Sequence, residues 1–172
     1  TRVIIIFSFL TIMLVGILAR VSYVISRDIY REQIQDQTRL LSALLAADLE
    51  TKSLDLTPPD KNSLAYKHFH RILNKGLEKT NLSGAFIFNR DLEILITARE
   101  NISPSRLKIN RKEINDLSSG SSTASLPFKS DDGQWYLWGF FRMNENWYLG
   151  VQENMDRLSK LDDLSLLFLL IG

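Results

Sequence analysis

The sequence lacks several of the residues on which common protein chemistries depend. It has no cysteine among its 172 residues and only two histidines. The absence of cysteine excludes disulfides, thiolate zinc sites and cysteine nucleophiles, and is compatible with an oxidising or a reducing compartment. His68 and His70 lie two positions apart on an expected helix, so their side chains point about 200° apart and cannot easily share one ion. We therefore expect no metal site.

The charged residues also lack a predominant sign. Lysine and arginine total 21, aspartate and glutamate total 20, and the formal net charge is +1. No strong field of one sign attracts nucleic acid, so no nucleic-acid partner is expected. The sequence contains no G-x-S-x-G, no phosphate-binding glycine loop and no H-E-x-x-H, so we expect neither catalytic residues nor a cofactor within it.

Hydrophobic residues are concentrated at the two ends of the chain. Residues 3–19 read VIIIFSFLTIMLVGILA, in which Ser8 and Thr11 are the polar side chains. A helix of about 20 apolar residues crosses a hydrocarbon layer of about 30 Å. No small-residue cleavage site follows, as it would in a signal peptide. Residues 1–20 are therefore predicted to form a first transmembrane helix with the lipid bilayer as its partner.

The second apolar run, LSLLFLLIG, occupies residues 164–172. It is less than half as long as a membrane span requires. We interpret residues 161–172 as the start of a second transmembrane helix, truncated in a fragment of a longer membrane protein. Residues 21–160 would then form a domain whose two ends meet the same membrane face.

Helical periodicity continues beyond the first apolar run. Residues 20–50 contain no proline or glycine, and apolar residues recur at helical spacing through Ile25, Ile29 and Ile34. We predict a long juxtamembrane helix over residues 21–50. Residues 21–34 are expected to pair with a second copy, and residues beyond Leu40 to cover a sheet. A loop containing two prolines follows, and then a second helix over residues 64–80.

The periodicity becomes extended after residue 84. GAFIFN and LEILITA flank Asn89-Arg90-Asp91 and predict a hairpin. A long connection over residues 101–120 contains one short helix at most, around residues 111–117. Three further strands follow, TASLPF, QWYLWGFF and NWYLGVQE, so that residues 84–153 supply the sheet. From residue 154 the chain is helical again, with Met155, Leu158 and Leu161 on one face.

The strand at residues 134–141 presents two sets of side chains because they alternate between its faces. Gly139 leaves room for a helix backbone, so its set, with Trp135, Leu137 and Phe141, is assigned to the helix-packed face. The other set contains a phenol, an indole and a guanidinium, and is the candidate pocket wall; an aromatic core is the alternative. Arg99 and Arg106 lie at the mouth of the long connection, where a ligand carboxylate could reach them, with solvated surface as the alternative. The candidate ligand-binding residues are Tyr136, Trp138, Phe140, Arg142, Phe86, Phe88, Arg99 and Arg106.

The hairpin FIFNRDLEIL, the paired aromatic strands in DGQWYLWGFFRMNENWYLGVQENMDRL and the preceding long helix carry a family resemblance. Residues 20–160 resemble the sensor region of a bacterial transmembrane receptor with a single Cache (PDC, PAS-like) domain. The resemblance implies an α+β fold: a long N-terminal helix continuous with a transmembrane span, a five-stranded antiparallel sheet, and an exit helix into a second span. One face of the sheet would pack on the long helix, and the other would form a small-molecule pocket.

The same resemblance implies the sensing part of a sensor histidine kinase of a two-component system. The receptor would lie in the bacterial cytoplasmic (inner) membrane with its sensor domain extracytoplasmic, and it would signal as a homodimer through paired helices that include Met155, Leu158 and Leu161. A small-molecule ligand and a cytoplasmic response regulator would be its partners, and ATP and Mg would serve a kinase region beyond residue 172. The alternatives are the input module of a chemoreceptor or a diguanylate cyclase, or a non-catalytic membrane-anchored protein that binds a protein partner.

Overall fold

The structure, a computed structural model, describes residues 2–49, 54, 60–80, 82–99, 102 and 104–155. The described chain divides into two units, one that contains α1 as far as Ile34 and the other Gln35–Met155. The predicted exit helix beyond Met155, with Leu158 and Leu161, and the predicted start of a second span at residues 161–172 lie outside the described residues.

The first unit is described through the helix α1 (Arg2–Ala47), which also enters the second unit. Among the described residues, α1 is the one helix long and apolar enough to cross a membrane, and none of its most apolar window is buried. The hydroxyl of Thr11 donates a hydrogen bond of 2.8 Å to the carbonyl of Phe7. This bond satisfies the hydroxyl of Thr11 within the helix itself.

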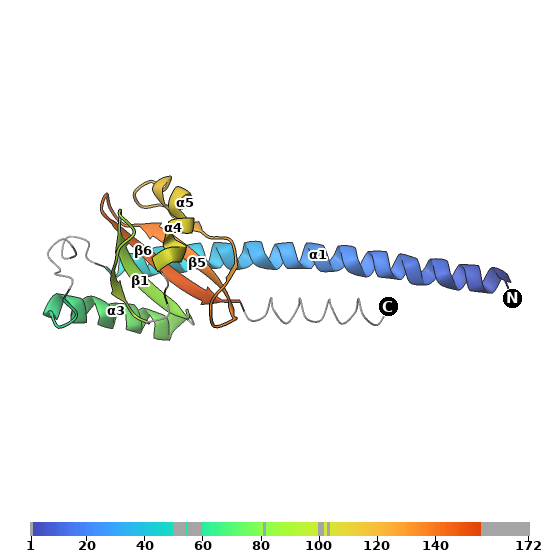
Figure 1. The fold of residues 1–172 in the computed structure, drawn as a ribbon, viewed down its shortest axis with the longest axis horizontal. Coiled ribbons are helices and arrows are strands. Elements are labelled where there is room, and N and C mark those ends of the chain that lie inside the picture. The colour runs from blue at the N-terminus through green and yellow to red at the C-terminus, as the bar shows by residue number, and fades with distance from the viewer. Residues whose placement is uncertain are drawn as a thin grey trace. The chain divides into compact units, whose positions relative to one another are not determined.

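The second unit is built on an antiparallel sheet in the order β2-β1-β6-β5-β3, with β4 also paired to β5. Figure 1 shows the two long strands β5 and β6 crossing this unit. The strands are β1 (Gly84–Asn89), β2 (Ile94–Thr97), β3 (Ser122–Ala124), β4 (Phe128–Lys129), β5 (Trp135–Arg142) and β6 (Trp147–Asn154). The predicted antiparallel sheet is confirmed, with six strands in place of five.

The additional strand arises because the expected strand TASLPF is interrupted between β3 and β4. The hydroxyl of Ser125 accepts a hydrogen bond from the backbone N–H of Trp138 and donates one to the carbonyl of Leu126. Pro127 has no N–H with which to continue a ladder. The regular pairing with β5 therefore stops after Ala124, although the N–H of Ser125 still donates to the carbonyl of Trp138, and it resumes at Phe128.

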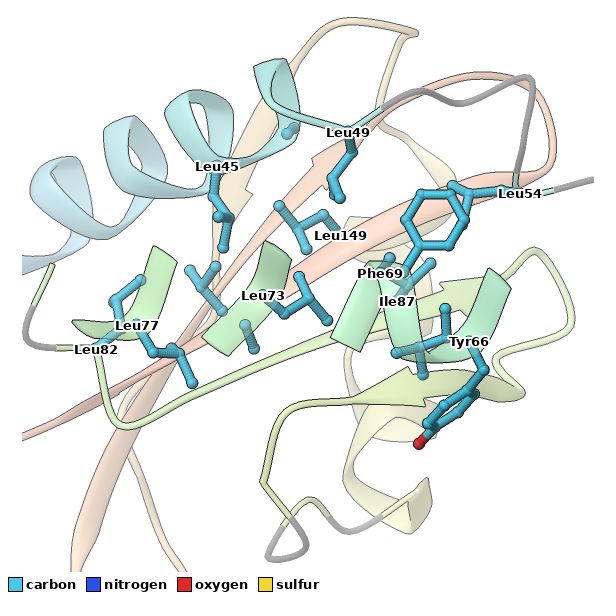
Figure 2. Packing of buried hydrophobic residues seen from close by; sticks show 14 residues of the cluster. Leu45, Leu49, Leu54, Tyr66, Phe69, Leu73, Leu77, Leu82, Ile87 and Leu149 are labelled. Atoms are coloured by element: carbon cyan, nitrogen blue, oxygen red, sulfur yellow. The ribbon is translucent and has the colours of Figure 1, made fainter. Parts of the chain in front are cut away.

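One face of the sheet is covered by the last part of α1 and by α3 (Leu64–Thr80). Ser63 caps α3, since its hydroxyl accepts a hydrogen bond from the backbone N–H of Tyr66. Figure 2 shows how aliphatic side chains of the two helices meet the strands in this layer. Its buried members include Leu45 and Leu49 of α1, Phe69, Leu73 and Leu77 of α3, and Ile87, Leu149 and Val151 of the sheet.

The opposite face carries an aromatic cluster under two short helices, α4 (Pro104–Ile109) and α5 (Arg111–Asn115). Leu107 of α4 and Ile114 of α5 are fully buried against it. One short helix was expected in this connection, and the structure has two. Leu107 and Ile114 are each brought to the sheet by a separate turn of helix. Asn110 lies between these two turns and separates α4 from α5.

Two glycines bring backbone or ring atoms close to the central strands, one on each face. A Cβ at Gly139 would lie 2.8 Å from the backbone carbonyl oxygen of Thr38 in α1. A Cβ at Gly150 would lie 2.2 Å from the ring of Phe86. The first contact confirms that the Gly139 face of β5 is the helix-packed face.

We predict that Gly139→Ala destabilises the sheet domain by about 1–3 kcal/mol, because the added methyl group meets a backbone atom that cannot rotate away. Gly84→Ala in β1 is the matched control. The atom nearest to a Cβ at residue 84 would be Cβ of Gln152, at an ordinary van der Waals distance of 3.5 Å. Chemical denaturation followed by the fluorescence of the three tryptophans measures both. Equal stability of the two variants would contradict the close contact between α1 and β5.

Candidate functional site

The predicted pocket wall lies in the aromatic cluster. Trp138 is 5.3 Å from the ring of Phe86 and 6.0 Å from that of Phe140, both in edge-to-face arrangements. Phe88 packs edge-to-face on Phe140 and is stacked on Tyr148 at 5.2 Å. Trp138 and Phe140 are at most 1% exposed. These side chains therefore fill the space between the sheet and the two short helices.

The polar side-chain atoms of Trp138 and Tyr136, two members of the predicted pocket wall, are satisfied within the protein. The indole N–H of Trp138 donates to the side-chain oxygen of Gln152 at 2.8 Å. The hydroxyl of Tyr136 donates to Asp132 at 2.8 Å. A ligand that entered this layer would have to replace these bonds as well as the ring contacts.

A cavity of about 270 Å³ lies at the rim of the same face. Its lining comes from four elements: the turn between β1 and β2, α5, the end of β5, and β6. The lining residues are Arg90, Asp91, Arg111, Asn115, Arg142 and Tyr148. Arg142 is thus the member of the predicted set that lines this cavity, and Tyr148 joins the cavity floor to the aromatic cluster through Phe88.

The turn between β1 and β2 positions Arg90 and Asp91. Asn89 closes the turn, because its side-chain oxygen accepts from the N–H of Glu93 and its amide donates to the Glu93 carboxylate, both at 2.9 Å. Leu92 takes a left-handed conformation with φ of 65°, which is unfavourable for a residue with a branched side chain. Its side chain is buried in the aromatic cluster, and this burial offsets the strain.

Arg142 is held by the backbone around it. Its Nε–H donates to the carbonyl of Asn144 at 3.1 Å, and its Nη1 donates to the carbonyl of Leu117 at 2.7 Å. Its guanidinium also lies 5.7 Å from the centre of the Tyr148 ring. A guanidinium has five N–H donors, so this group keeps further donors while its position is fixed.

The other two arginines of the cavity differ from Arg142. Arg90 and Arg111 are exposed, and within the part of the chain that the structure describes, neither side chain forms a hydrogen bond or an ion pair. With Asp91 as the one lining carboxylate, the cavity has a formal charge of +2.

Arg106 and Arg99 lie elsewhere. Arg106 donates to the carbonyl of Lys129, lies 4.8 Å from the Phe128 ring and is 4.0 Å from the Asp131 carboxylate. It therefore joins α4 to the region of β4. Arg99 is exposed after β2, where its backbone bonds with the hydroxyl of Thr97.

Both histidines lie on α3, and His70 lines a second, more open hollow of about 480 Å³. His70 bonds with the Asn74 amide at 3.0 Å and stacks on Tyr66, whereas His68 contacts the edge of Phe69. Among the described residues, no group of three or more histidine, aspartate or glutamate side chains is placed to hold a metal ion.

A polar contact joins α1 to the sheet on the helix-packed face. Thr38 donates a hydrogen bond of 2.6 Å to the carboxylate of Glu153 in β6. Burial raises the pKa of Glu153 above its ordinary value of 4.5, and the bond from Thr38 lowers it in part. Because the folded state holds this proton more tightly than the unfolded state, Glu153 favours folding most at low pH.

We predict that Glu153→Gln stabilises the domain near neutral pH and removes part of its pH dependence. In the wild type this contribution is fully present below about pH 4.5 and is lost as the pH rises through the raised pKa of Glu153. The amide oxygen can still accept the bond from Thr38. Thermal unfolding between about pH 4.5 and 7.5 measures the effect, with the exposed Glu78→Gln as the control. If the unfolding temperatures of the wild type and Glu153→Gln changed in parallel with pH, the prediction would be wrong.

Solved structures share this fold, and two of them are described here. One is the extracellular domain of vpHK1S-Z8, provisionally described as a histidine kinase, with a TM-score of 0.54 and 17% identity over 81% of this chain and 57% of that one. The other is the ligand-binding domain of the Campylobacter jejuni chemoreceptor Tlp3 in complex with 4-methylisoleucine, with a TM-score of 0.51 and 16% identity over 81% of this chain and 56% of that one. No family model and no curated protein matches the sequence.

The chain therefore shares the α+β fold of these two domains, with the long apolar helix α1 at its start, as predicted from the order of its elements. It spans a little over half the length of each of the two neighbours.

Sequence reasoning did not select the cavity residues Arg90, Asp91, Arg111, Asn115 and Tyr148. The turn and the short helix that carry four of them were expected, but their proximity depends on how the long connection folds over the sheet.

Proposed function

We propose that this chain is the signal-sensing and transmembrane part of a receptor that binds a small extracytoplasmic ligand. The observation that carries the proposal is the junction between α1 and the sheet. The helix with membrane-spanning composition ends packed on a fold shared with sensor domains, and Thr38 and Gly139 leave no space between them. A change in β5 therefore acts directly on the last part of α1.

The mechanism is a shift between two arrangements of the sheet and the helix. A ligand changes their populations only if it binds one arrangement more tightly than the other. We place its binding site at the cavity that contains Arg142, and we assign the aromatic residues Tyr136, Trp138, Phe140, Phe86 and Phe88 to the layer that supports the cavity floor. Arg99 and Arg106 could contact a larger ligand from the neighbouring connection.

The output of the receptor is proposed to be a histidine kinase in the bacterial cytoplasmic membrane. ATP and Mg would serve the kinase region, and a cytoplasmic response regulator would receive the phosphoryl group. A chemoreceptor output is the second candidate, because one of the structural neighbours described above is a chemoreceptor domain and another comes from a protein described as a kinase.

We propose that the receptor is a homodimer whose α1 helices pair. Ile25 and Ile29 are exposed one helical turn apart, and Leu40 and Leu44 are likewise exposed on α1. Large aliphatic side chains at this spacing favour pairing with a second helix. Ile34, also assigned to the pairing segment, is buried. Met155 is buried at the end of β6, where the chain would pass to an exit helix containing Leu158 and Leu161.

Single cysteines placed through residues 21–34 test the pairing of α1, and the absence of native cysteine makes the scan clean. We expect disulfide crosslinks between copies in membranes at positions that repeat every three to four residues, as on one helix face. Cysteines on the exposed face of α3, such as Lys75→Cys, serve as controls. Uniform absence of crosslinks through residues 21–34 would exclude this dimer.

Ligand sensing is tested with the full chain in lipid nanodiscs. We expect at least one compound from a panel of amino acids, organic acids, phosphates and osmolytes to raise the unfolding temperature, since a ligand that binds only the folded state stabilises it. The same compound should change the crosslinking yield within residues 21–34. A panel that produces neither effect would count against a small-molecule sensor and favour a membrane-anchored protein that binds a protein partner.

A further inference from the structure

We infer that the cavity lined by Arg90, Arg111 and Arg142 binds a compact oxyanion with two negative charges, such as a dicarboxylate or a phosphate. This inference rests on the proposed sensing function and specifies the ligand class of that site. Three arginines from three separate segments, the β1–β2 turn, α5 and the end of β5, line this cavity together with one carboxylate, that of Asp91.

The charge of the cavity favours a dianion over a neutral or singly charged ligand. The lining carries a formal charge of +2, and a ligand with two negative charges neutralises it. Arg90 and Arg111 have no protein partner within the described residues. Their N–H groups are therefore available without the loss of an existing ion pair, and guanidinium groups bind carboxylates and phosphates through paired hydrogen bonds.

The cavity also contains a preorganised donor. Two backbone carbonyls and the face of Tyr148 fix the guanidinium of Arg142 before any ligand arrives. A ligand that accepts from its remaining N–H groups does not have to order that side chain, which reduces the entropic cost of binding. Asn115 adds an amide to the wall of the same cavity.

The surroundings disfavour an apolar ligand. The space between the sheet and the short helices is filled by Phe86, Phe88, Trp138 and Phe140, so the cavity cannot extend into that layer without displacing buried rings. Its volume of about 270 Å³ lies just below the range of about 300–1,000 Å³ typical of sites for drug-sized molecules. A ligand of a few heavy atoms with charged ends fits these limits.

The test measures binding of inorganic phosphate and of malonate to the full chain in nanodiscs by isothermal titration calorimetry, with acetate and glycine at equal ionic strength as comparisons. We expect phosphate or malonate to bind at least about tenfold more tightly than acetate or glycine. Tighter binding of phosphate would identify a phosphate group as the ligand, and tighter binding of malonate would identify a dicarboxylate.

Substitutions at the two unpaired arginines and at the carboxylate make the test specific. Arg90→Gln and Arg111→Gln should each weaken binding of the preferred anion about tenfold or more, the loss expected for a charge-assisted hydrogen bond. Asp91→Asn should strengthen it several-fold, because it removes the one repulsive charge, and a misfolded variant could not produce such a gain. Arg71→Gln, at an exposed arginine on α3 outside this cavity, should leave binding unchanged.

The outcomes separate this inference from the sensing function on which it rests. A neutral or zwitterionic ligand that binds equally well to wild type, Arg90→Gln and Arg111→Gln would overturn the dianion site while supporting a sensor. Anion binding that is lost in both arginine variants but does not change crosslinking within residues 21–34 would support the site and overturn the sensing role. Equal affinity for acetate and malonate would also overturn the inference.

Discussion

The contact between the backbone of Thr38 and the bare Cα of Gly139 is the constraint on which the other features of the sheet domain depend. It sets how closely α1 approaches β5, because any side chain at residue 139 would meet a carbonyl oxygen. The nearby bond from Thr38 to Glu153 ties the same turn of helix to β6. The turn of α1 that contains Thr38 is therefore fixed in position on both central strands, β5 and β6. The rest of the layer formed by α1 and α3 packs on the sheet from this fixed point.

The two faces of the sheet are packed with different kinds of side chain. The helix-packed face is filled mainly with leucine, isoleucine and valine, with Tyr66 and Phe69 of α3 among them, and two helices cover it. The opposite face is covered by only two short helices, and large rings fill the remaining volume there. Gly150 leaves room for the ring of Phe86, whose Cζ would lie 2.2 Å from a Cβ at that position. Because the rings close the centre of this face, open space is left at its rim.

The rim cavity and the helix contact share one strand. Arg142 at the end of β5 lines the cavity, and Gly139 lies three residues earlier in the same strand, about 10 Å along the backbone. Arg142 also holds Leu117, and Tyr148 of the adjacent strand bears on the aromatic layer. A ligand that pulls on Arg142 thus acts on a strand whose other face touches α1, which gives the proposed relay a short physical route.

The sequence by itself determined the elements and much of their polarity. The apolar run before Arg20, the change from helical to alternating spacing after Gly84 and the single glycine in an aromatic strand are local patterns. Local patterns are sufficient to predict a long helix, an antiparallel sheet and the helix-packed face of β5. The interruption at Ser125 depends on a side chain bonding to another strand, which spacing does not show. Only the tertiary structure decided that the aromatic residues close into a core and that Arg90, Arg111 and Arg142 line one cavity, because these residues are far apart in the chain and meet only once the long connection folds over the sheet.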